Sequence, residues 1–417
     1  MRVFKFGGAS VKDANGVKNV AKVLQQVGYD DVFLVVSAMG KMTNAFEALT
    51  KAYCNNEENL DDQLAAIKNY HLTIIEELFE EDAQRVRNKI AIYFAEIASF
   101  FSENTIEDYD YSYDQLVSKA ELISTTIVGK YLSHIGIQNT WLDVRDFVQT
   151  NEDYRDAKVD WEATEERIKT GIVKNGTLYI TQGFLGRSPS GSTTTLGREG
   201  SDYTAGIFAY CLDAESVSIW KDVQGVLNAD PRHFSETQLL EQISYTEAIE
   251  LAFYGASVIH PKTLQPLQKK EIPLYVKSFI DPSSKGTSVS RGLHLFPEMP
   301  CFIVKKNQIL LSISSLDFSF IVERNISDIF RLLHQYKMKV NMIQNSAISF
   351  SVCLDDKYQN FQALLSALEN TFKIRYFREV SLYTIRHFTK EAIAKLEKDN
   401  TVLLKQLNQQ TVQLVIE

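Results

Sequence analysis

Lys5 lies inside the apolar run Arg2–Phe6, and two glycines, Gly7 and Gly8, follow at once. A lysine at the end of a strand can reach a phosphate as a compact point charge, and glycines let a ligand come close to the backbone. The order differs from a Walker loop, because here the lysine precedes the glycines. Considered alone, the stretch indicates either a phosphate contact or a surface lysine before a turn.

Two further segments combine anion-binding groups with the expected ends of strands. In VVSAMGKMTN, Ser37 and Thr43 can donate hydrogen bonds to an anion, although turn and capping chemistry is the commoner reason for such residues. In TLGREGSD, Arg198, Ser201 and Asp202 precede a helix whose free N–H groups and dipole suit a carboxylate or phosphate. Arg198 can bind a carboxylate through two parallel hydrogen bonds.

A fourth segment, WKDVQGVLNADPR, carries Lys221, Asp222 and Arg232 on one loop. One cationic loop is unremarkable. It is, however, the third loop that can hold an anion at the edge of one expected sheet. Three such loops together indicate a nucleoside polyphosphate as ligand.

Glu121 gives a weaker signal. Apolar residues at Leu116, Ala120, Ile123 and Ile127 mark the core-facing stripe of a helix, and Glu121 lies well off that stripe at 100° per residue. Spacing alone therefore favours a solvated glutamate.

These segments need a scaffold that brings the ends of strands together. Over residues 1 to about 290, β-branched runs such as DVFLVVSA, LYITQGF, SVSIWKDV and IPLYVKSF alternate with helical stretches. The alternation predicts an α/β three-layer sandwich, with a mainly parallel sheet between helices, in which ligands lie at the carboxyl ends of the strands. A helical lobe is expected at about residues 55–110.

The pattern changes near LHLFPEMPC, where Pro297 and Pro300 indicate a linker. Beyond it we expect strand, helix, two strands, helix and strand, the βαββαβ order of a ferredoxin-like unit. A helix over residues 390–407 and a strand over 411–417 are expected to form a second, shortened unit. The sequence thus predicts two domains, at residues 1–295 and 296–417.

The chain has 417 residues, 45% of them hydrophobic, and a net charge of -9. The charge argues against a nucleic-acid surface, and no run approaches the ~20 apolar residues of a membrane span. The four cysteines are far apart and form no C-x-x-C pair, so we expect reduced thiols in a cytoplasmic protein and no zinc site.

Taken together, these segments resemble the aspartate kinases (aspartokinases) of the amino-acid kinase family. KFGGAS, VSA…TN, AELIS, TLGREGSD, KDVQG…DPR and ISYTEA…HP follow that family's motifs in order, and six motifs in order are far more specific than one. The C-terminal unit is similar to the ACT modules with which these enzymes sense end-product amino acids.

The resemblance implies transfer of the γ-phosphoryl group of MgATP to the side-chain carboxylate of L-aspartate, giving 4-phospho-L-aspartate and ADP. This is the first step toward lysine, threonine and methionine. In the implied roles, Lys5 reaches the transferred phosphoryl group and Asp202 orients Lys5. The residues implied to bind aspartate are Ser37, Thr43, Glu121 (on the α-ammonium), Arg198 and Ser201 (both on the α-carboxylate). The residues implied to bind ATP are Gly7, Gly8, Lys221, Asp222, Leu227, Arg232 and Ser257. Mg²⁺ would bridge the phosphates with few or no protein ligands.

The sequence departs from the family's motifs at several positions. Glu199 stands where glycine is usual and puts a negative side chain where two anionic substrates meet, so we expect it to face outward or pair with a basic neighbour. Lys221 replaces threonine and adds positive charge near the phosphates. Leu227 stands where tyrosine is common, and Ser257 where lysine is common, a loss for which Lys221 can compensate.

The regulatory region leaves its effector open. Asn341 and Ala347 stand where lysine-sensing members often carry acids, so lysine, threonine or no effector at all are compatible with the sequence. A homodimer is expected, because ACT units usually bury a sheet edge or helix face against a partner. Two alternative functions also stay open: a kinase with another acceptor, and a catalytically silent amino-acid sensor, which Glu199 favours.

Overall fold

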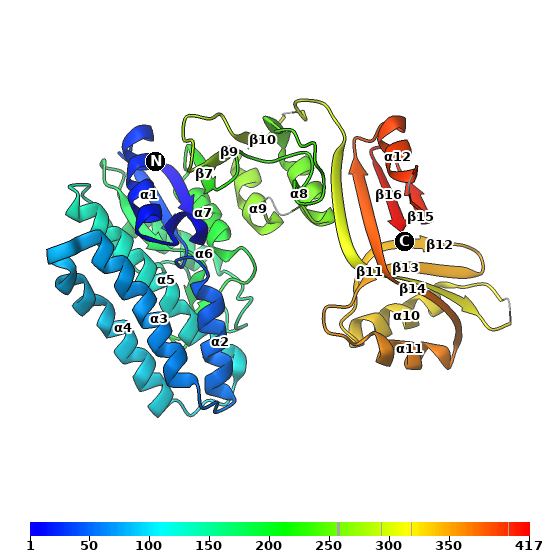
Figure 1. Cartoon of the computed structure of the whole chain (residues 1–417), viewed down its shortest axis with the longest axis horizontal. Helices are drawn as coiled ribbons and strands as arrows, with labels where there is room; N and C mark the ends of the chain where they lie inside the picture. Colours follow the sequence, from blue (N-terminus) through cyan, green and yellow to red (C-terminus); the bar gives the residue numbers. More distant parts are fainter. Residues whose placement is uncertain (257–258, 293, 318, 399) are drawn as a thin grey trace. The chain divides into compact units, whose positions relative to one another are not determined.

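The structure is a computed structural model that describes residues 1–256, 259–292, 294–317, 319–398 and 400–417. The chain divides into two compact units (Figure 1). Unit 1 comprises Met1–Val226, Leu239–Ile249 and Val258–His294, and unit 2 comprises Leu227–Gln238, Glu250–Ser257 and Leu295–Glu417. Unit 2 therefore takes two short segments from the N-terminal part of the sequence in addition to the C-terminal region.

Unit 1 is built on an eight-stranded sheet with the order β3-β4-β2-β1-β7-β9-β10-β8. Its strands are β1 (Arg2–Phe6), β2 (Val32–Val36), β3 (Thr140–Leu142), β4 (Tyr179–Gln182), β7 (Ser216–Lys221), β8 (Gln242–Ser244), β9 (Leu274–Ser278) and β10 (Thr287–Ser290). A separate antiparallel hairpin pairs β5 (Leu185–Arg187) with β6 (Thr193–Thr195). All neighbouring strands of the large sheet run parallel except β9 and β10, which confirms the predicted mainly parallel sheet.

Helices cover both faces of this sheet. The helices of this part of the chain are α1 (Ala14–Val27), α2 (Met42–Cys54), α3 (Leu60–Phe79), α4 (Ala83–Glu103), α5 (Tyr109–His134), α6 (Trp161–Gly171), α7 (Gly200–Cys211), α8 (Tyr245–Tyr254) and α9 (Pro261–Lys270). On one face Phe33 of β2 stacks on Phe208 of α7, with ring centroids 4.2 Å apart. On the other face Ile180 of β4 lies against α5 at Gly129. Residues next to each other in a strand point to opposite faces, and Ile180 pairs with Leu34 rather than Phe33, so the three-layer arrangement is confirmed.

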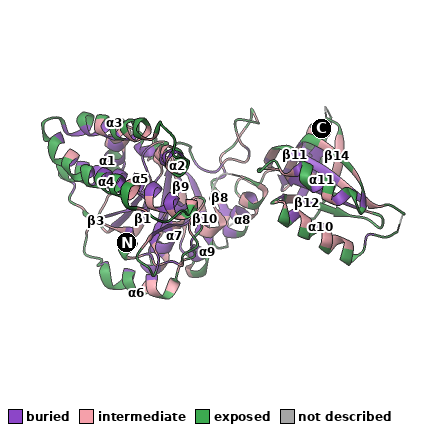
Figure 2. Ribbon diagram, turned by 90° about the horizontal axis from the view of Figure 1, so that it is seen from below, coloured by how far each residue is buried: buried purple, intermediate pink, exposed green. Residues whose placement is uncertain are grey.

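The expected helical lobe is formed by α3 and α4, which lie beside α2 and α5 (Figure 1). The outer sides of α3 and α4 are exposed, whereas Ile67, Ile74 and Ile97 on their inner sides are buried (Figure 2). Helix α5 differs from its neighbours, because it contacts α2, α3 and α4 as well as β2, β3 and β4. It is therefore the central helix of this part of the molecule.

Unit 2 contains a six-stranded antiparallel sheet with the order β12-β13-β11-β14-β16-β15. Its elements are β11 (Cys301–Ser315), α10 (Glu323–Gln335), β12 (Lys339–Asn345), β13 (Ser349–Asp355), α11 (Phe361–Glu369), β14 (Phe372–Arg386), α12 (Lys390–Glu397), β15 (Val402–Leu407) and β16 (Thr411–Ile416). The first six follow the predicted βαββαβ order. Helices α10 and α11 cover one face, where Leu333 and Leu364 pack with Leu311.

The second unit of the predicted pair is shortened and shares strands with the first. β11 and β14 are long enough to pair with each other along both halves, and the register of this pairing shifts around Gln308. Helix α12 covers the remaining half, where Ile393 packs with Ile385 and Val412.

One predicted element of this region is wrong. The helix expected over residues 390–407 ends at Glu397, and Val402–Leu407 forms strand β15. This segment pairs with β16 along its length. Pairing with the next strand of the chain, β16, thus overrides the local helical pattern, a common outcome for short segments whose intrinsic preference is weak.

Within the described residues, we find no helix with the length and apolarity that crossing a bilayer requires.

Candidate active site

Lys5 and Asp202 form a buried ion pair at the carboxyl end of the large sheet. Lys5 Nζ lies 2.6 Å from Asp202 Oδ1, and the two residues are 9% and 3% exposed. Lys221, the last residue of β7, places its ammonium 3.9 Å from the other oxygen of Asp202. Burial raises the pKa of Asp202, but the charges of Lys5 and Lys221 outweigh it and hold the pKa below its ordinary value. The carboxylate is therefore ionised at neutral pH and fixes two cations in one place.

The fold explains why these three groups meet. β1 lies between β2 and β7, with Lys5 opposite Val35 on one side and Ile219 on the other. Asp202 occupies the first turn of α7, which covers the Lys5 face of the sheet. The carboxyl ends of parallel neighbours lie at the same edge, so Lys5, Lys221 and the beginning of α7 come together.

At Gly7 and Gly8 neighbouring atoms lie so close to the backbone that a side chain would meet them. A Cβ atom on Gly8 would lie 2.7 Å from the carbonyl oxygen of Gly40 and 2.8 Å from that of Ala38. The Gly40 N–H donates to the Gly8 carbonyl at 3.0 Å, so the loops after β1 and β2 are bonded together. A Cβ atom on Gly7 would lie 3.3 Å from Lys5 Nζ and would cover the ammonium. The glycines thus keep two loops in contact and the Lys5 ammonium uncovered.

Ser37 and Thr43 lie on the loop after β2 and at the start of α2, and both are half-buried. The Ser37 N–H donates to the Phe6 carbonyl at 3.0 Å, and its own carbonyl accepts a hydrogen bond from Ser124 of α5 at 2.6 Å. Ser37 is therefore held between β1 and α5, at the sheet edge that carries Lys5.

Glu121 is buried in α5, at 3% exposure, so the solvated position favoured by its spacing is wrong. Between Ser112 and Leu132, every residue of α5 is buried except Gln115, Lys119 and Lys130, because other elements surround the helix. A stripe of apolar residues indicates the exposed side of a helix only where one side faces water.

The environment of Glu121 lacks a complete set of partners. Burial raises its pKa to about 8, although an N–H of Ala38 and the charge of Lys5 act in the opposite direction. The Oε2 atom is buried without a hydrogen-bond partner within the described chain. A buried carboxyl oxygen without a donor is costly, and a ligand's ammonium group would supply that donor.

The N-terminal turn of α7 rests on the end of β4. A Cβ atom on Gly183 would lie 2.3 Å from Cβ of Ser201, and Ser201 is 8% exposed. The Phe184 N–H donates to the Thr204 hydroxyl at 2.9 Å. These contacts aim the free N–H groups at the start of the helix toward the sheet edge, while Arg198, two residues before the helix, is exposed.

Asp114 holds the strand that leads to this loop. Its carboxylate accepts hydrogen bonds from the N–H and hydroxyl of Thr195 at 2.8 and 2.7 Å, and from the N–H of Arg155. The pKa of Asp114 is raised to about 6, because the effect of burial exceeds the opposite effect of these hydrogen bonds. Asp114 thus ties α5 to β6, three residues before Arg198.

Glu199 precedes α7 in the left-handed region, with φ 54°. Its side chain is half-buried, and Oε2 is buried with no hydrogen-bond partner among the described residues. Burial lowers the pKa of His260, while the charge of Glu199 raises it and that of Arg198 lowers it. Glu199 therefore lies close to His260. Of the two arrangements that we expected, it does not simply face solvent, and among the described residues no ion pair joins it to a basic neighbour.

The remaining nucleotide positions fall in different parts of the chain. Asp222 follows β7 in unit 1 and is exposed. Leu227 and Arg232 belong to unit 2, where Arg232 binds Asp230, with Nη2 2.6 Å from Oδ2. Ser257 lies outside the described residues. The joint contribution of these positions to one nucleotide site stays a prediction.

Sequence reasoning missed Gly40, Gly183 and Ser124, which hold the site together. Gly183 follows the buried run YITQ of β4, so a glycine directly after a buried strand was a usable signal. No comparable local signal marks Ser124.

The site combines two lysines around one carboxylate, glycines that admit a ligand to the backbone, and a helix N-terminus. These features define an α/β enzyme that transfers a phosphoryl group by positioning and charge neutralisation. Residues 1–278 match the amino acid kinase family, and the chain belongs to that family.

Within this family the chain is an aspartokinase. It is 34% identical over 362 residues to lysine-sensitive aspartokinase 3 of Escherichia coli, covering 85% of this chain and 78% of that protein. It is 30% identical to chloroplastic aspartokinase 1 of Arabidopsis thaliana over 85% of this chain, but spans only 63% of that longer protein.

Solved structures agree. The chain matches E. coli aspartokinase III in complex with lysine and aspartate with a TM-score of 0.84 and 29% identity, over 100% of this chain and 95% of that one. The same protein in complex with aspartate and ADP matches with a TM-score of 0.80 and 29% identity, over 100% of this chain and 96% of that one.

Proposed function

We propose that the chain transfers the γ-phosphoryl group of MgATP to the side-chain carboxylate of L-aspartate, giving 4-phospho-L-aspartate and ADP. The observation that carries this proposal is the cluster of Lys5, Asp202 and Lys221 at the carboxyl end of the sheet, in which Lys5 and Asp202 are buried and Lys221 is half-buried. The binding of aspartate and ADP by the E. coli relative supports aspartate and an adenine nucleotide as ligands here.

The chemistry needs no general base. A carboxylate with an ordinary pKa of about 3.9 is ionised at neutral pH, so the acceptor is already a nucleophile. The enzyme must bring two anions together and neutralise the charge of the transferred group.

In our proposal Lys5 contacts the transferred phosphoryl group, and Asp202 positions Lys5. The 2.6 Å ion pair leaves the Lys5 ammonium with further N–H donors beyond the one that faces Asp202. Lys221 supplies a second positive charge beside the same carboxylate. This charge compensates for the lysine that is common at position 257, where this chain has a serine.

Aspartate would be held at three points. Glu121, whose buried oxygen lacks a donor, accepts from the α-ammonium group. Arg198 and the N-terminal turn of α7 at Ser201 bind the α-carboxylate, since exposed guanidinium and free helix N–H groups both suit this anion. Ser37 and Thr43 complete the pocket from the β2 side.

ATP would approach over Gly7 and Gly8, which leave the backbone and the Lys5 ammonium accessible. The other proposed nucleotide contacts are Lys221, Asp222, Leu227, Arg232 and Ser257. The described residues contain no group of three or more side chains suited to hold a metal ion, so we propose that Mg²⁺ is held chiefly by the phosphates. Bound there, it would neutralise phosphate charge.

The test is ADP release with ATP, Mg²⁺ and L-aspartate, compared with L-glutamate or UMP as acceptor. Of these three acceptors, we expect turnover only with aspartate. Replacing Lys5 with Gln should lower kcat at least about 100-fold, the usual scale for one group that stabilises transition-state charge. Lys22→Gln on the exposed side of α1 is the matched control. Turnover only with another acceptor would overturn the proposal, and no turnover with any acceptor would indicate a silent sensor.

For regulation, we propose that unit 2 binds lysine as effector, as the name of the E. coli relative suggests for that enzyme. Asn341 does not offer a carboxylate. Its Oδ1 accepts from Lys305 Nζ at 2.8 Å, and its Nδ2 donates to Gln308 at 2.7 Å. We therefore expect weaker inhibition than an acidic side chain would allow. Titrating lysine and threonine into the kinase assay decides between them, and inhibition by threonine alone would reverse this assignment.

We further propose a homodimer through unit 2. β12 is an edge strand, and near it Ile343, Ile348 and Phe320 are 40%, 44% and 70% exposed. Unpaired edges and exposed apolar side chains are typical of surfaces that a partner covers. Light scattering should give twice the chain mass, and Ile343→Lys should shift it toward the monomer. A wild-type monomer at all concentrations would rule the dimer out.

A cytoplasmic location is part of the same proposal, and the four free cysteines support it, since three of them are buried thiols without a disulfide.

A further inference from the structure

The loop of residues 151–158 joins the three elements to which we assign the aspartate contacts. Its two ends are paired, since the Asn151 N–H donates to the Lys158 carbonyl at 3.0 Å. Within it Arg155 has a left-handed backbone, with φ 69°. That conformation is unfavourable for a residue with a side chain and persists only where the surrounding contacts impose it. The contacts of Arg155 must therefore outweigh the cost of its backbone conformation.

The backbone of this loop lies against α5 and against the segment that leads to α7. The Arg155 N–H donates to both carboxylate oxygens of Asp114 in α5, at 3.2 and 3.1 Å. The Arg155 carbonyl oxygen lies 3.2 Å from the position that a Cβ atom of Gly197 would occupy. The Ala157 N–H donates to the Thr195 carbonyl of β6 at 2.9 Å. The loop thus supports the segment between β6 and α7 over its whole approach to the helix.

The side chain of Arg155 reaches two helices. Its guanidinium lies over the rings of Tyr113 and Tyr109 in α5, with Cζ 4.4 and 5.5 Å from the ring centroids. Its Nη1 lies 3.1 Å from Oδ1 of Asp110 in the same helix, and its Nη2 lies 3.8 Å from Oε1 of Glu47 in α2. A single half-exposed ion pair stabilises little, but one guanidinium that contacts two carboxylates and two rings links both helices.

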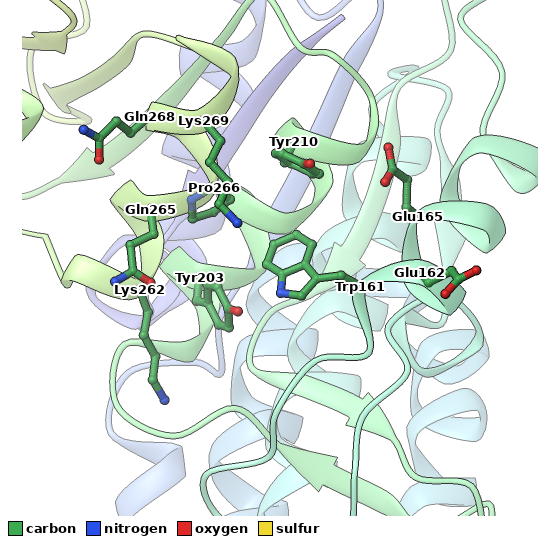
Figure 3. Close-up of a pocket in the computed structure, with 10 residues that line it drawn as sticks. All are labelled: Trp161, Glu162, Glu165, Tyr203, Tyr210, Lys262, Gln265, Pro266, Gln268 and Lys269. Atoms are coloured by element: carbon green, nitrogen blue, oxygen red, sulfur yellow. The ribbon is translucent and has the colours of Figure 1, made fainter.

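The next residue, Asp156, anchors the loop to α9 through an ion pair with Lys262. Figure 3 shows the Lys262 side chain directed away from Trp161, in the pocket that α6, α7 and α9 line. A Cβ atom on Gly197 would lie 2.6 Å from Oδ1 of Asp156, so this carboxylate also borders the segment before α7. The loop therefore ties that segment to α9 as well as to α5.

We propose that Arg155 is a positioning residue of the aspartate pocket. This inference rests on the proposed function, in which Thr43 at the start of α2, Glu121 of α5 and Arg198 before α7 bind the substrate. Arg155 meets α2 at Glu47, one helical turn after Thr43, and its backbone lies between α5 and the segment that leads to α7. It holds the three binding groups at the mutual distances that one aspartate molecule requires, although it does not itself contact the substrate.

The effect of losing Arg155 should fall on aspartate and not on ATP. The glycines that we propose for ATP follow β1, which is not among the elements that Arg155 joins. Arg155→Met keeps an unbranched side chain without the charge, and we expect it to raise the KM for aspartate about tenfold, since displaced binding groups lose their contacts. The KM for ATP and kcat should stay within about twofold of the wild type.

The measurements are the ADP-release assay and calorimetric titration of the full-length protein with aspartate, which reads binding without turnover. Arg155→Lys keeps the charge beside Asp110 but not the planar group over the rings, so it should recover part of the affinity. Arg85→Met, at an exposed position of α4, is the matched control and should behave like the wild type. The Arg155 side chain is 40% exposed, so these variants should fold, and thermal unfolding checks this.

Two results would overturn the proposal while the wild type still binds aspartate. One is a wild-type KM and affinity for aspartate in Arg155→Met. The other is an equal rise in both KM values together with a lower unfolding midpoint, because a purely structural role would disturb the whole site. If the wild type binds aspartate without turnover, the proposed reaction fails and the calorimetric comparison still decides the role of Arg155. A wild type that binds no aspartate would overturn both proposals.

Discussion

In our proposal Glu121 binds the ammonium group of aspartate, so aspartate binding should release a proton from this residue. The pKa of the buried Glu121 carboxyl is raised to about 8, so at pH 7 only about one molecule in ten carries the carboxylate. Pairing with the ammonium group of aspartate requires the ionised form. Binding should therefore release about 0.9 proton per aspartate at pH 7, and roughly 0.25 at pH 8.5.

The same equilibrium sets the apparent affinity. Where one molecule in ten is competent, the dissociation constant is about tenfold higher than that of the ionised protein. Raising the pH from 7 to 8.5 should accordingly tighten aspartate binding by roughly sevenfold to eightfold, since the competent fraction rises from about 0.1 to about 0.75.

The measurement is calorimetric titration with aspartate in two buffers of different ionisation enthalpy, at pH 7 and at pH 8.5. The difference between the apparent enthalpies gives the number of protons released. Glu121→Gln keeps the size of the side chain but cannot ionise, so its binding should be weaker and release no proton. Proton release near zero in the wild type at pH 7, or equal release from wild type and Glu121→Gln, would refute the reasoning.

Three further predictions follow from the same contacts. Because the pKa of Glu121 is raised in the folded protein, its contribution to stability is present below its unfolded pKa of about 4.5 and is lost as the pH rises through about 8. Thermal unfolding should therefore show that Glu121→Gln is more stable than the wild type at pH 9 but not at pH 4. Lys221→Gln should raise the KM for ATP and lower kcat/KM about tenfold or more in the ADP-release assay, whereas an unchanged kcat/KM would exclude Lys221 from the phosphate site. Gly8→Ala should lower the free energy of unfolding by about 1–3 kcal/mol, because its Cβ would meet two carbonyl oxygens, and a wild-type midpoint in chemical denaturation would contradict the close approach.

Much of the fold follows from local sequence. The runs that became β1, β2, β4 and β7 are buried almost without interruption, which is typical of strands in a covered parallel sheet, whereas buried and partly exposed residues alternate along β9. Two of the strands that were not predicted, β3 and β8, have only three residues each, and the neighbouring strands stabilise them. The same reason explains the error over residues 390–407, where β16 decides the conformation of the segment beside it.

The site shows a similar division. Lys5, Ser37 and Lys221 lie at or just after the ends of strands, so their meeting follows from the sheet alone. Glu121 is different. It does lie off the apolar stripe of the helix, as the spacing predicts, but the conclusion that such a position faces water is wrong. Helix α5 has no solvent side at that position. Only the packing of α2, α3 and α4 around it, which no single helix encodes, turns that residue from a surface acid into a buried one.

Burial also gives Glu121 its chemical value. A solvated glutamate is ionised at pH 7 and binds an ammonium group only weakly, since water competes for both partners. The buried carboxyl of Glu121 gains its charge only above about pH 8 in the absence of a cation. A substrate ammonium supplies the missing donor and the compensating charge together. In the binding mode that we propose, recognition of aspartate by this residue is thus coupled to a proton, and a change in the packing of α5 would alter that coupling without touching the substrate.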